Sequence, residues 1–347
     1  MTTVYDVARL AGVSTATVSR VVHGSNLVHP ETRQRVLVVI EQLGFVPDGS
    51  AQGLSRRRKD IIGLVALERG LDEIDIEHNS LLFVDQIVHA AEAVLRPSEC
   101  SLLLAFGRGG EQFQRRVRSL SGKVDGLLMA EEVMPASQLR ALAQRVPIVL
   151  IAGPRDEREL DVIAVDNAAG VRALVTHLTR AHGHRRLCFV SGPPDAPDAQ
   201  ERLAAFDGMV RDTPGCAADP VIQGDFSEAS GSAAARVLLA RPSRPEAVVC
   251  ANDQMAIGVL REFQQAGIQV PGAVAITGFD DIYPSRMVTP ALTTVSQPLR
   301  ELGTLATERL LARIEGTAAP RLSRVLPTHL VVRASCGCAG GQIGERD

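Results

Sequence analysis

The sequence predicts an α/β protein in which a small helical module precedes a larger core of doubly wound parallel sheets. Two observations predict this division. Residues 1–47 carry apolar residues at helical spacing together with helix-capping residues, whereas strand-length apolar runs alternate with helical stretches from Ile61 onward. Such alternation is typical of parallel sheets with helices on both faces. The chain of 347 residues is long enough for one small and one or two larger domains.

The first 22 residues predict two short helices joined by a tight turn. Thr3 can cap the first helix, with Asp6 as its partner in an imperfect capping box, and Gly12 can end it. Ser14 can cap the second helix. Apolar residues at three- and four-residue spacing can pack the pair on a third helix: Val4, Val7, Ala8, Leu10, Val13, Val18, Val21 and Val22. The pattern is typical of a helix-turn-helix, a DNA-binding motif, and an ordinary helical hairpin is the alternative.

The start of the second helix is the part of such a motif that reaches base edges in the major groove. Its outward groups are Thr15, Ala16, Thr17, Ser19 and Arg20. A third helix is predicted over residues 30–43, with Val36, Leu37 and Ile40 facing inward and residues 44–47 ending it. The residues that we expect to contact DNA in this module are Tyr5, Ser14, Thr15, Ala16, Thr17, Ser19 and Arg20.

Charge is unevenly divided along the chain. The protein has a formal net charge of −3, yet residues 1–60 hold eight basic and five acidic side chains, so this part carries +3 and the remainder −6. A basic module attached to an acidic core is typical of a protein whose smaller part contacts phosphates. The basic run at residues 56–59 favours phosphate contact, and a solvated linker is the alternative.

The N-terminal module closely resembles the head of the lactose-repressor family of bacterial transcription factors. The family pattern, Ala-Gly-Val-Ser followed by Thr-Val-Ser-Arg-Val and an apolar residue, occurs here at residues 11–14 and 17–22. The resemblance implies that residues 48–60 form a hinge that becomes a short helix only on DNA. Leu54 corresponds to a leucine that wedges into the minor groove, and Arg56 is a further DNA contact. Glycines within this segment weaken a helix, so we expect its ordering to depend on DNA and dimer contacts.

The resemblance extends over about residues 2–334 and implies a core of the periplasmic-binding-protein type. Its landmarks include residues 165–167, 183–186, 251–256, 277–281 and 290–297. Such a core has two α/β subdomains joined by three crossovers, with the ligand at the carboxyl ends of the strands. The expected boundaries are about 61–183 with 297–325 for the N-subdomain, about 184–296 with 326–334 for the C-subdomain, and 335–347 for a flexible tail.

Four positions of the core correspond to residues that face the effector in this family: Arg202, Phe226, Asn252 and Asp280. Arg202 offers a rigid fork of donors and Asp280 two acceptor oxygens, a combination that suits vicinal hydroxyls. Asn252 both donates and accepts hydrogen bonds, and Phe226 could stack on a sugar or a base. The alternative is that Arg202 and Asp280 form a structural ion pair and that Phe226 belongs to the core.

We expect no catalytic residues, no cofactor and no metal. No Gly-x-Gly-x-x-Gly follows a strand, and residues 107–110 lack the spacing and the acidic residue of a dinucleotide site. The six cysteines lack the paired spacings of a zinc site, and we interpret them as free thiols in a reducing compartment. Cys336-Gly-Cys338 leaves a redox or metal-binding role open as an alternative.

These features predict a cytoplasmic, homodimeric transcriptional repressor that binds double-stranded, pseudo-palindromic operator DNA and responds to a small, sugar-like metabolite. The apolar runs are too short to span a membrane, and no secretory signal is apparent. Induction by a sugar and co-repression by a nucleobase or nucleoside use the same parts, so both stay open, as does assembly beyond a dimer. A sugar-binding transport receptor and an α/β enzyme are the alternatives from other classes.

Overall fold

The computed structural model describes residues 2–22, 27–45, 58–68, 82–98, 100–130, 133–154 and 157–338. The chain divides into two compact units, Met1–Asp60 and Ile61–Asp347. The predicted class, an α/β core preceded by a helical head, is confirmed. Among the described residues, no helix is long and apolar enough to cross a membrane.

The head consists of α1 (Val4–Ala11), α2 (Thr15–Val22) and α3 (Pro30–Leu43). Two expectations about its core were wrong, because Leu10 and Leu37 are exposed. On a helical wheel each of the two leucines lies beside the arc of residues that faces the other helices. In α3, Val39 rather than Leu37 is buried together with Val36. The buried core consists of Val7, Ala8, Ala11, Val18, Val21, Val36 and Val39.

The turn between α1 and α2 is held by the caps that the sequence indicates. The capping box is complete: the Asp6 backbone N–H donates to Thr3 Oγ1, and the Thr3 N–H donates to the Asp6 carboxylate. Gly12 ends α1 with φ of 65°, a left-handed conformation that costs glycine little. The Thr17 N–H donates to Ser14 Oγ at 3.1 Å, so Ser14 caps α2.

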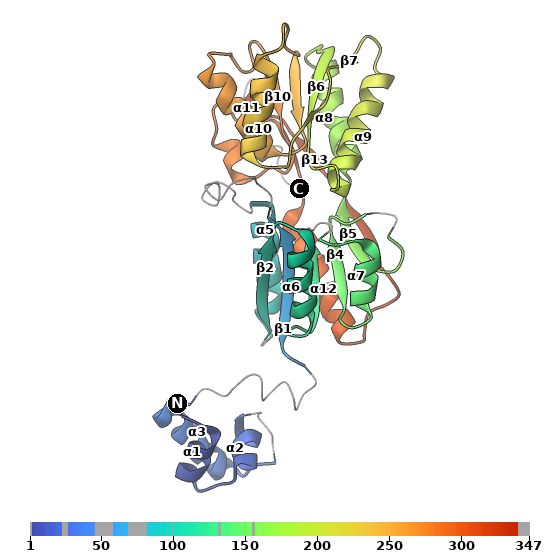
Figure 1. Ribbon diagram of the computed structural model, residues 1–347. Helices are drawn as coiled ribbons and strands as arrows, with labels where there is room; N and C mark the ends of the chain where they lie inside the picture. The colour runs from blue at the N-terminus through green and yellow to red at the C-terminus, as the bar shows by residue number, and fades with distance from the viewer. Residues whose placement is uncertain are drawn as a thin grey trace. The chain divides into compact units, whose positions relative to one another are not determined.

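The core begins with a parallel sheet of six strands in the order β12-β5-β4-β3-β1-β2. Helices α5 and α12 cover one face, and α6 and α7 cover the other (Figure 1). The four central strands are buried on both faces, as their continuous apolar runs indicate, whereas the edge strands β2 and β12 are largely exposed. The strands are β1 (Ile61–Leu67), β2 (Ser101–Gly107), β3 (Gly126–Ala130), β4 (Ile148–Ile151), β5 (Asp161–Val165) and β12 (Ser323–Leu326); the helices are α5 (Leu82–Leu95), α6 (Gly110–Ser121), α7 (Ala136–Ala143) and α12 (Leu299–Ile314).

A second parallel sheet has the order β10-β9-β6-β7, with β8 also paired to β6. Helix α8 pairs with α9, and α10 pairs with α11. Its strands are β6 (Arg186–Ser191), β7 (Ala217–Ala218), β8 (Ile222–Gln223), β9 (Ala247–Cys250) and β10 (Ala275–Thr277); its helices are α8 (Asn167–Arg180), α9 (Pro197–Asp212), α10 (Glu228–Leu239) and α11 (Asp253–Gln265).

The structure corrects two of the expected boundaries. Helix α8 was placed in the N-subdomain, but its apolar residues join the core of the second sheet. The first crossover therefore lies between β5 and α8 rather than near residue 183. Residues 335–338 were assigned to a flexible tail, but a 3-10 turn over Ala334–Cys336 buries Ser335 and Cys336. This segment follows β13 (His329–Val331), which pairs antiparallel with β11 (Thr294–Ser296).

Candidate functional sites

The start of α2 presents small and polar side chains at the surface of the head. Ala16, Ser19 and Arg20 are exposed, and Thr15 is half-buried. Thr17 has a structural role in addition to its expected one, since its Oγ1 lies 3.0 Å from Ser14 Oγ at the cap. Tyr5 on α1 is 73% exposed. The start of α2 thus exposes hydroxyl, methyl and guanidinium groups. Groups of these kinds contact the edges of bases in the major groove.

The expected hinge contacts, Leu54 and Arg56, lie outside the described residues. The DNA contacts of the head therefore stay predictions. The structure supplies the surface that such contacts require, a helix start whose cap is already satisfied within the protein.

In the core, Arg202 is buried on α9 at the centre of a polar network. Its Nε donates to Asn167 Oδ1 at 2.8 Å, and one Nη donates to the Ala251 carbonyl at 2.7 Å. The guanidinium is 3.3 Å from a carboxylate oxygen of Asp198 and 3.5 Å from one of Asp280. Its Cζ lies 3.8 Å from the centroid of the Phe279 ring, a cation–π contact.

Asp280 follows β10 and completes this network. Gln297 donates its Nε2 to the Asp280 carboxylate at 2.5 Å. The backbone of Asp280 has φ of 119°, a conformation that L residues rarely adopt, and its N–H donates to the Val295 carbonyl. Such strain at a buried, charged residue is typical of functional positions. The sequence therefore placed Arg202 and Asp280 together correctly, and whether they bind a ligand stays a proposal.

Asn252 and Phe226 lie at the same edge of the sheet, and their contacts are to other parts of the protein backbone. Asn252 caps α11, because its Oδ1 accepts the Met255 N–H at 3.0 Å, and its Nδ2 donates to the Phe226 carbonyl at 2.9 Å. Phe226 has φ of 72°. Its ring lies against the backbone of Gly192, where an added Cβ would be 2.2 Å from Phe226 Cε1. Both residues thereby shape the edge at which ligands of parallel sheets bind.

The network contains residues that were not predicted as site residues. Asn167 lies shortly after the end of β5, and its Nδ2 donates to Asp198 and Glu201, both at 2.9 Å. Gln297 immediately follows β11, and its Oε1 is buried without a hydrogen-bond partner among the described residues. Polar residues shortly after a strand are the signal for such positions, but β5 opens with a buried charge and β11 has only three residues, so neither strand is evident from the sequence.

Asp253 is a further buried acid beside this network. Burial, followed by the nearby Asp280 charge, raises the pKa of Asp253 well above its usual value of 3.8. Its carboxylate accepts hydrogen bonds from Thr294 Oγ1 at 2.5 Å and from the Ile282 N–H at 3.0 Å. These contacts fasten the segment after β10 to the start of α11. Asp253 thus helps to hold the segment that carries Asp280.

Comparisons with known proteins match both parts of the chain. Residues 3–48 match the family described as bacterial regulatory proteins, lacI family, and residues 175–336 match a periplasmic binding protein-like domain. The HTH-type transcriptional regulator CelR of Thermobifida fusca is 34% identical over 95% of this chain and 96% of its own length. The ribose operon repressor of Escherichia coli (strain K12) is 34% identical over 90% of this chain and 93% of its own.

Solved structures agree with these matches. A lac repressor dimer bound to operator and the anti-inducer ONPF is 29% identical with a TM-score of 0.82, over 96% of this chain and 99% of that one. A complex of the transcriptional regulator CelR with cellobiose is 33% identical with a TM-score of 0.70, over 96% of this chain and 100% of that one. The chain therefore belongs to the lacI family of bacterial regulatory proteins.

Proposed function

We propose that this protein is a homodimeric transcriptional repressor whose affinity for a pseudo-palindromic operator is controlled by a small hydroxylated metabolite. The observation that carries the proposal is the Arg202–Asp280 network at the carboxyl ends of the second sheet, in a chain that begins with a helix-turn-helix. Relatives named as repressors, together with a lac repressor dimer bound to operator, support the DNA-binding half. The CelR–cellobiose complex supports a sugar or sugar derivative as effector.

In this proposal the head binds one operator half-site through the start of α2. Arg20 reads a base, while Ser14 and Thr17 keep the helix start rigid and Tyr5 contacts DNA from α1. Two heads related by a twofold axis bind the two half-sites. Residues 48–60 form the DNA-dependent hinge, with Leu54 in the minor groove and Arg56 beside it. The net charge of +3 on residues 1–60 supplies a sequence-independent, salt-dependent part of the affinity.

The effector in this proposal binds between Arg202 and Asp280. The two are 3.5 Å apart and mostly buried, so hydroxyl groups of a ligand would replace contacts that the side chains now make to the protein. Arg202 also contacts Asn167, which follows β5, and Asp280 contacts Gln297, which precedes α12. Both neighbours lie on crossovers to the first sheet. A ligand that alters these contacts therefore biases the relation between the subdomains.

The sign of the response follows from which arrangement the ligand prefers. An inducer favours the arrangement with low operator affinity, and a co-repressor favours the other. Because a regulator of this kind acts by differential binding, we infer that it has no catalytic turnover. Its target is chromosomal DNA, and we accordingly place its action in the cytoplasm.

The first experiment identifies both the operator sequence and the effector. Operator sequences are selected from random DNA with the full-length protein, and their binding is then measured with a panel of sugars that includes ribose and cellobiose and with nucleosides. We expect a twofold-symmetric site and one sugar class that changes operator affinity. Nucleosides alone changing it would favour the second candidate, co-repression with Phe226 stacked on a base. Selection of no symmetric site would contradict the proposal.

The operator contacts are tested by two substitutions with different signatures. Arg20→Ala should cost about 1 to 3 kcal/mol on the operator and less on random DNA, because a guanine contact is lost. Lys59→Ala should weaken binding evenly on both and reduce the salt dependence. Arg211→Ala, an exposed position on α9, is the control that should change neither. Equal losses on operator and random DNA for Arg20→Ala would show that Arg20 contacts only phosphate.

A further inference from the structure

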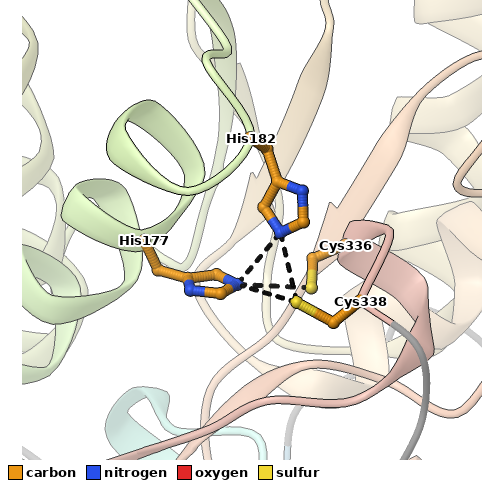
Figure 2. Close-up of side chains that lie close together, drawn as sticks. All are labelled: His177, His182, Cys336 and Cys338. Atoms are coloured by element: carbon orange, nitrogen blue, oxygen red, sulfur yellow. Dashed lines mark hydrogen bonds between the residues drawn. The ribbon is translucent and has the colours of Figure 1, made fainter.

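A cluster of two histidines and two cysteines lies outside the Arg202–Asp280 network. His177 is near the end of α8, His182 is in the turn before β6, and Cys336 and Cys338 belong to the C-terminal segment (Figure 2). Their four ligand atoms all lie within 4.8 Å of one another. The contacting pairs of histidine and cysteine are 156 to 161 residues apart in the sequence, so the fold rather than local spacing brings them together.

Four of the six separations between these atoms are close to the edges of a tetrahedron around one metal ion, and the other two are within 4.8 Å. The two histidine Nε2 atoms are 3.2 Å apart. His177 Nε2 is 3.4 Å from Cys336 Sγ and 3.7 Å from Cys338 Sγ, and His182 Nε2 is 3.4 Å from Cys338 Sγ. Tetrahedral zinc with ordinary bond lengths requires edges of about 3.3 Å between nitrogens and about 3.5 Å between nitrogen and sulfur. The four side chains are therefore gathered closely enough for a small adjustment to bring them to the positions of zinc ligands.

Hydrogen bonding accounts for this arrangement less well. A neutral imidazole nitrogen acts either as one donor or as one acceptor, yet His177 Nε2 faces His182 Nε2 and both sulfur atoms at once. A cation at the centre would satisfy all four atoms together. Thr293, which is not one of the four ligands, has its Oγ1 3.1 Å from Cys336 Sγ, so its hydroxyl can donate to a thiolate. Such contacts are typical of metal-bound cysteines.

We propose that His177, His182, Cys336 and Cys338 bind one Zn²⁺ ion in a closed Cys₂His₂ site. Four protein ligands leave no open position, so the ion has a structural rather than a catalytic role. Binding takes the two cysteines as thiolates and releases their protons, with no change in oxidation state. Gly337 allows the close spacing of the two cysteines, because its φ of 104° is one that other residues rarely adopt.

The ion would fasten the end of the described chain to the C-subdomain. Ser335 already attaches this segment to the sheet, because its Oγ donates to the Ile276 carbonyl and its N–H to the Ala291 carbonyl. The site lies toward the amino-terminal ends of β6 and β10, since His182 precedes β6 and Gly337 lies against Pro271. Arg202 and Asp280 lie at the opposite, carboxyl ends. Zinc should therefore change stability and leave the effector contacts intact.

The test begins with the metal content of the full-length protein, purified under reducing conditions without chelators. We expect one zinc per chain by elemental analysis. After exchange with Co²⁺ we expect the intense visible absorption of a tetrahedral cobalt site and a sulfur-to-cobalt charge-transfer band. Zinc should also protect two thiols per chain from alkylation. Substoichiometric metal and no cobalt spectrum in the reduced, folded protein would overturn the proposal.

Matched variants separate the site from nonspecific metal binding. Cys338→Ser and His182→Gln change partly exposed positions, so they should fold, and both should lose the cobalt spectrum and most of the zinc. Cys216→Ser and Cys100→Ser change half-buried cysteines elsewhere and should retain both. A chelator should lower the unfolding temperature of the wild type but not of Cys338→Ser. Unchanged metal content in Cys338→Ser would refute the assignment.

The outcome is independent of the regulatory function. Cys338→Ser should still bind the operator. Arg20→Ala should bind the operator more weakly but should contain as much zinc as the wild type. A disulfide between Cys336 and Cys338, detected by mass in protein kept under reductant and free of metal, would replace the zinc site with a redox pair and would also overturn the proposal.

Discussion

Two of the arginine–carboxylate networks among the described residues of the core differ in an informative way. In the first, Asp161 at the start of β5 accepts two hydrogen bonds from each of Arg309 and Arg313, at 2.7 to 3.1 Å. It also accepts the Leu322 N–H at 2.6 Å. In the second, Arg202 and Asp280 approach only to 3.5 Å, and Gln297 beside them keeps an acceptor without a partner among the described residues.

The difference indicates that the Asp161 network has a structural role, whereas the Arg202–Asp280 network can exchange protein contacts for contacts to a ligand. The Asp161 network fixes α12 to the edge of the first sheet at the amino-terminal end of β5, and its bidentate contacts leave little to be gained by rearrangement. The Arg202 network lies at the carboxyl ends of the second sheet, where ligands of such folds bind. We therefore expect substitutions in the first network to affect stability, and those in the second to affect ligand response.

The largest expected effect is that of Asp161→Asn. Removing this charge leaves Arg309 and part of Arg313 buried without their partner, which should lower the free energy of unfolding by about 3 to 5 kcal/mol. Chemical denaturation measures the loss, and Asp212→Asn at an exposed position is the control. Operator affinity and ligand response of the folded fraction should be unchanged. If Asp161→Asn changes the ligand concentration that alters operator binding, the Asp161 network is not purely structural.

The next effect is a pH dependence from the same residue. Burial acts against ionisation of Asp161, but hydrogen bonds from Arg313 and Arg309 outweigh it and lower its pKa from 3.8 to about 2. Because the folded-state pKa is lowered, the contribution is fully present above the unfolded pKa and is lost as the pH falls from about 4 toward 2. It should amount to about 2 kcal/mol. The stability difference between wild type and Asp161→Asn should shrink over this pH range, and a constant difference would contradict the assignment.

A smaller effect is expected at a crossover. Asn167→Ala removes the acceptor of Arg202 Nε and the donor to Asp198 and Glu201. We expect about tenfold more ligand to be needed for the same change in operator binding, which corresponds to about 1.4 kcal/mol. Affinity for operator without ligand should stay within twofold, and Asn252→Ala serves as a comparison at the same edge. If Asn167→Ala needs the same ligand concentration as the wild type, the contacts of Asn167 at the crossover have no part in the ligand response.

The smallest effect is that of Asn252→Ala. The substitution removes the cap of α11 and the hydrogen bond to the Phe226 carbonyl, and should lower the free energy of unfolding by about 1 kcal/mol. Ligand affinity should fall only through displacement of Phe226. Denaturation and calorimetry measured on one preparation distinguish the two effects. A loss of ligand binding larger than that of Asn167→Ala would instead make Asn252 a direct contact.

The sequence predicts much of this structure where the signal is local. Long apolar strands such as Ile61–Leu67 and Arg186–Ser191, and the caps at Thr3 and Ser14, follow from patterns within a few residues. The strand Asp161–Val165 gives a weaker signal because a buried charge opens it, and β11 does so because it has only three residues. Leu37 was predicted to face inward, but its position on the helix lies beside the buried arc that Val36 and Val39 form.

Site residues divide in the same way. Family motifs identified Arg202 and Asp280, which the fold brings together, whereas Asn167 and Gln297 gain their importance only from the crossovers that adjoin them. The six cysteines were interpreted as free thiols, with a metal or redox role for Cys336 and Cys338 as the alternative, but the proximity of these two to His177 and His182 was not predicted. Contacts between segments so far apart in the chain depend on tertiary packing, which spacing along the sequence does not encode.

The most direct test of the account is calorimetry of the identified effector with Arg202→Ala and Asp280→Ala, with Arg211→Ala as the control. Either core substitution should weaken ligand binding by at least tenfold, because the variant loses charged hydrogen-bonding groups that would contact the ligand, a loss of roughly 2 to 5 kcal/mol. Operator binding without ligand should survive in both variants. Undiminished ligand binding by both would place the effector site elsewhere and contradict the assignment of this network to sensing.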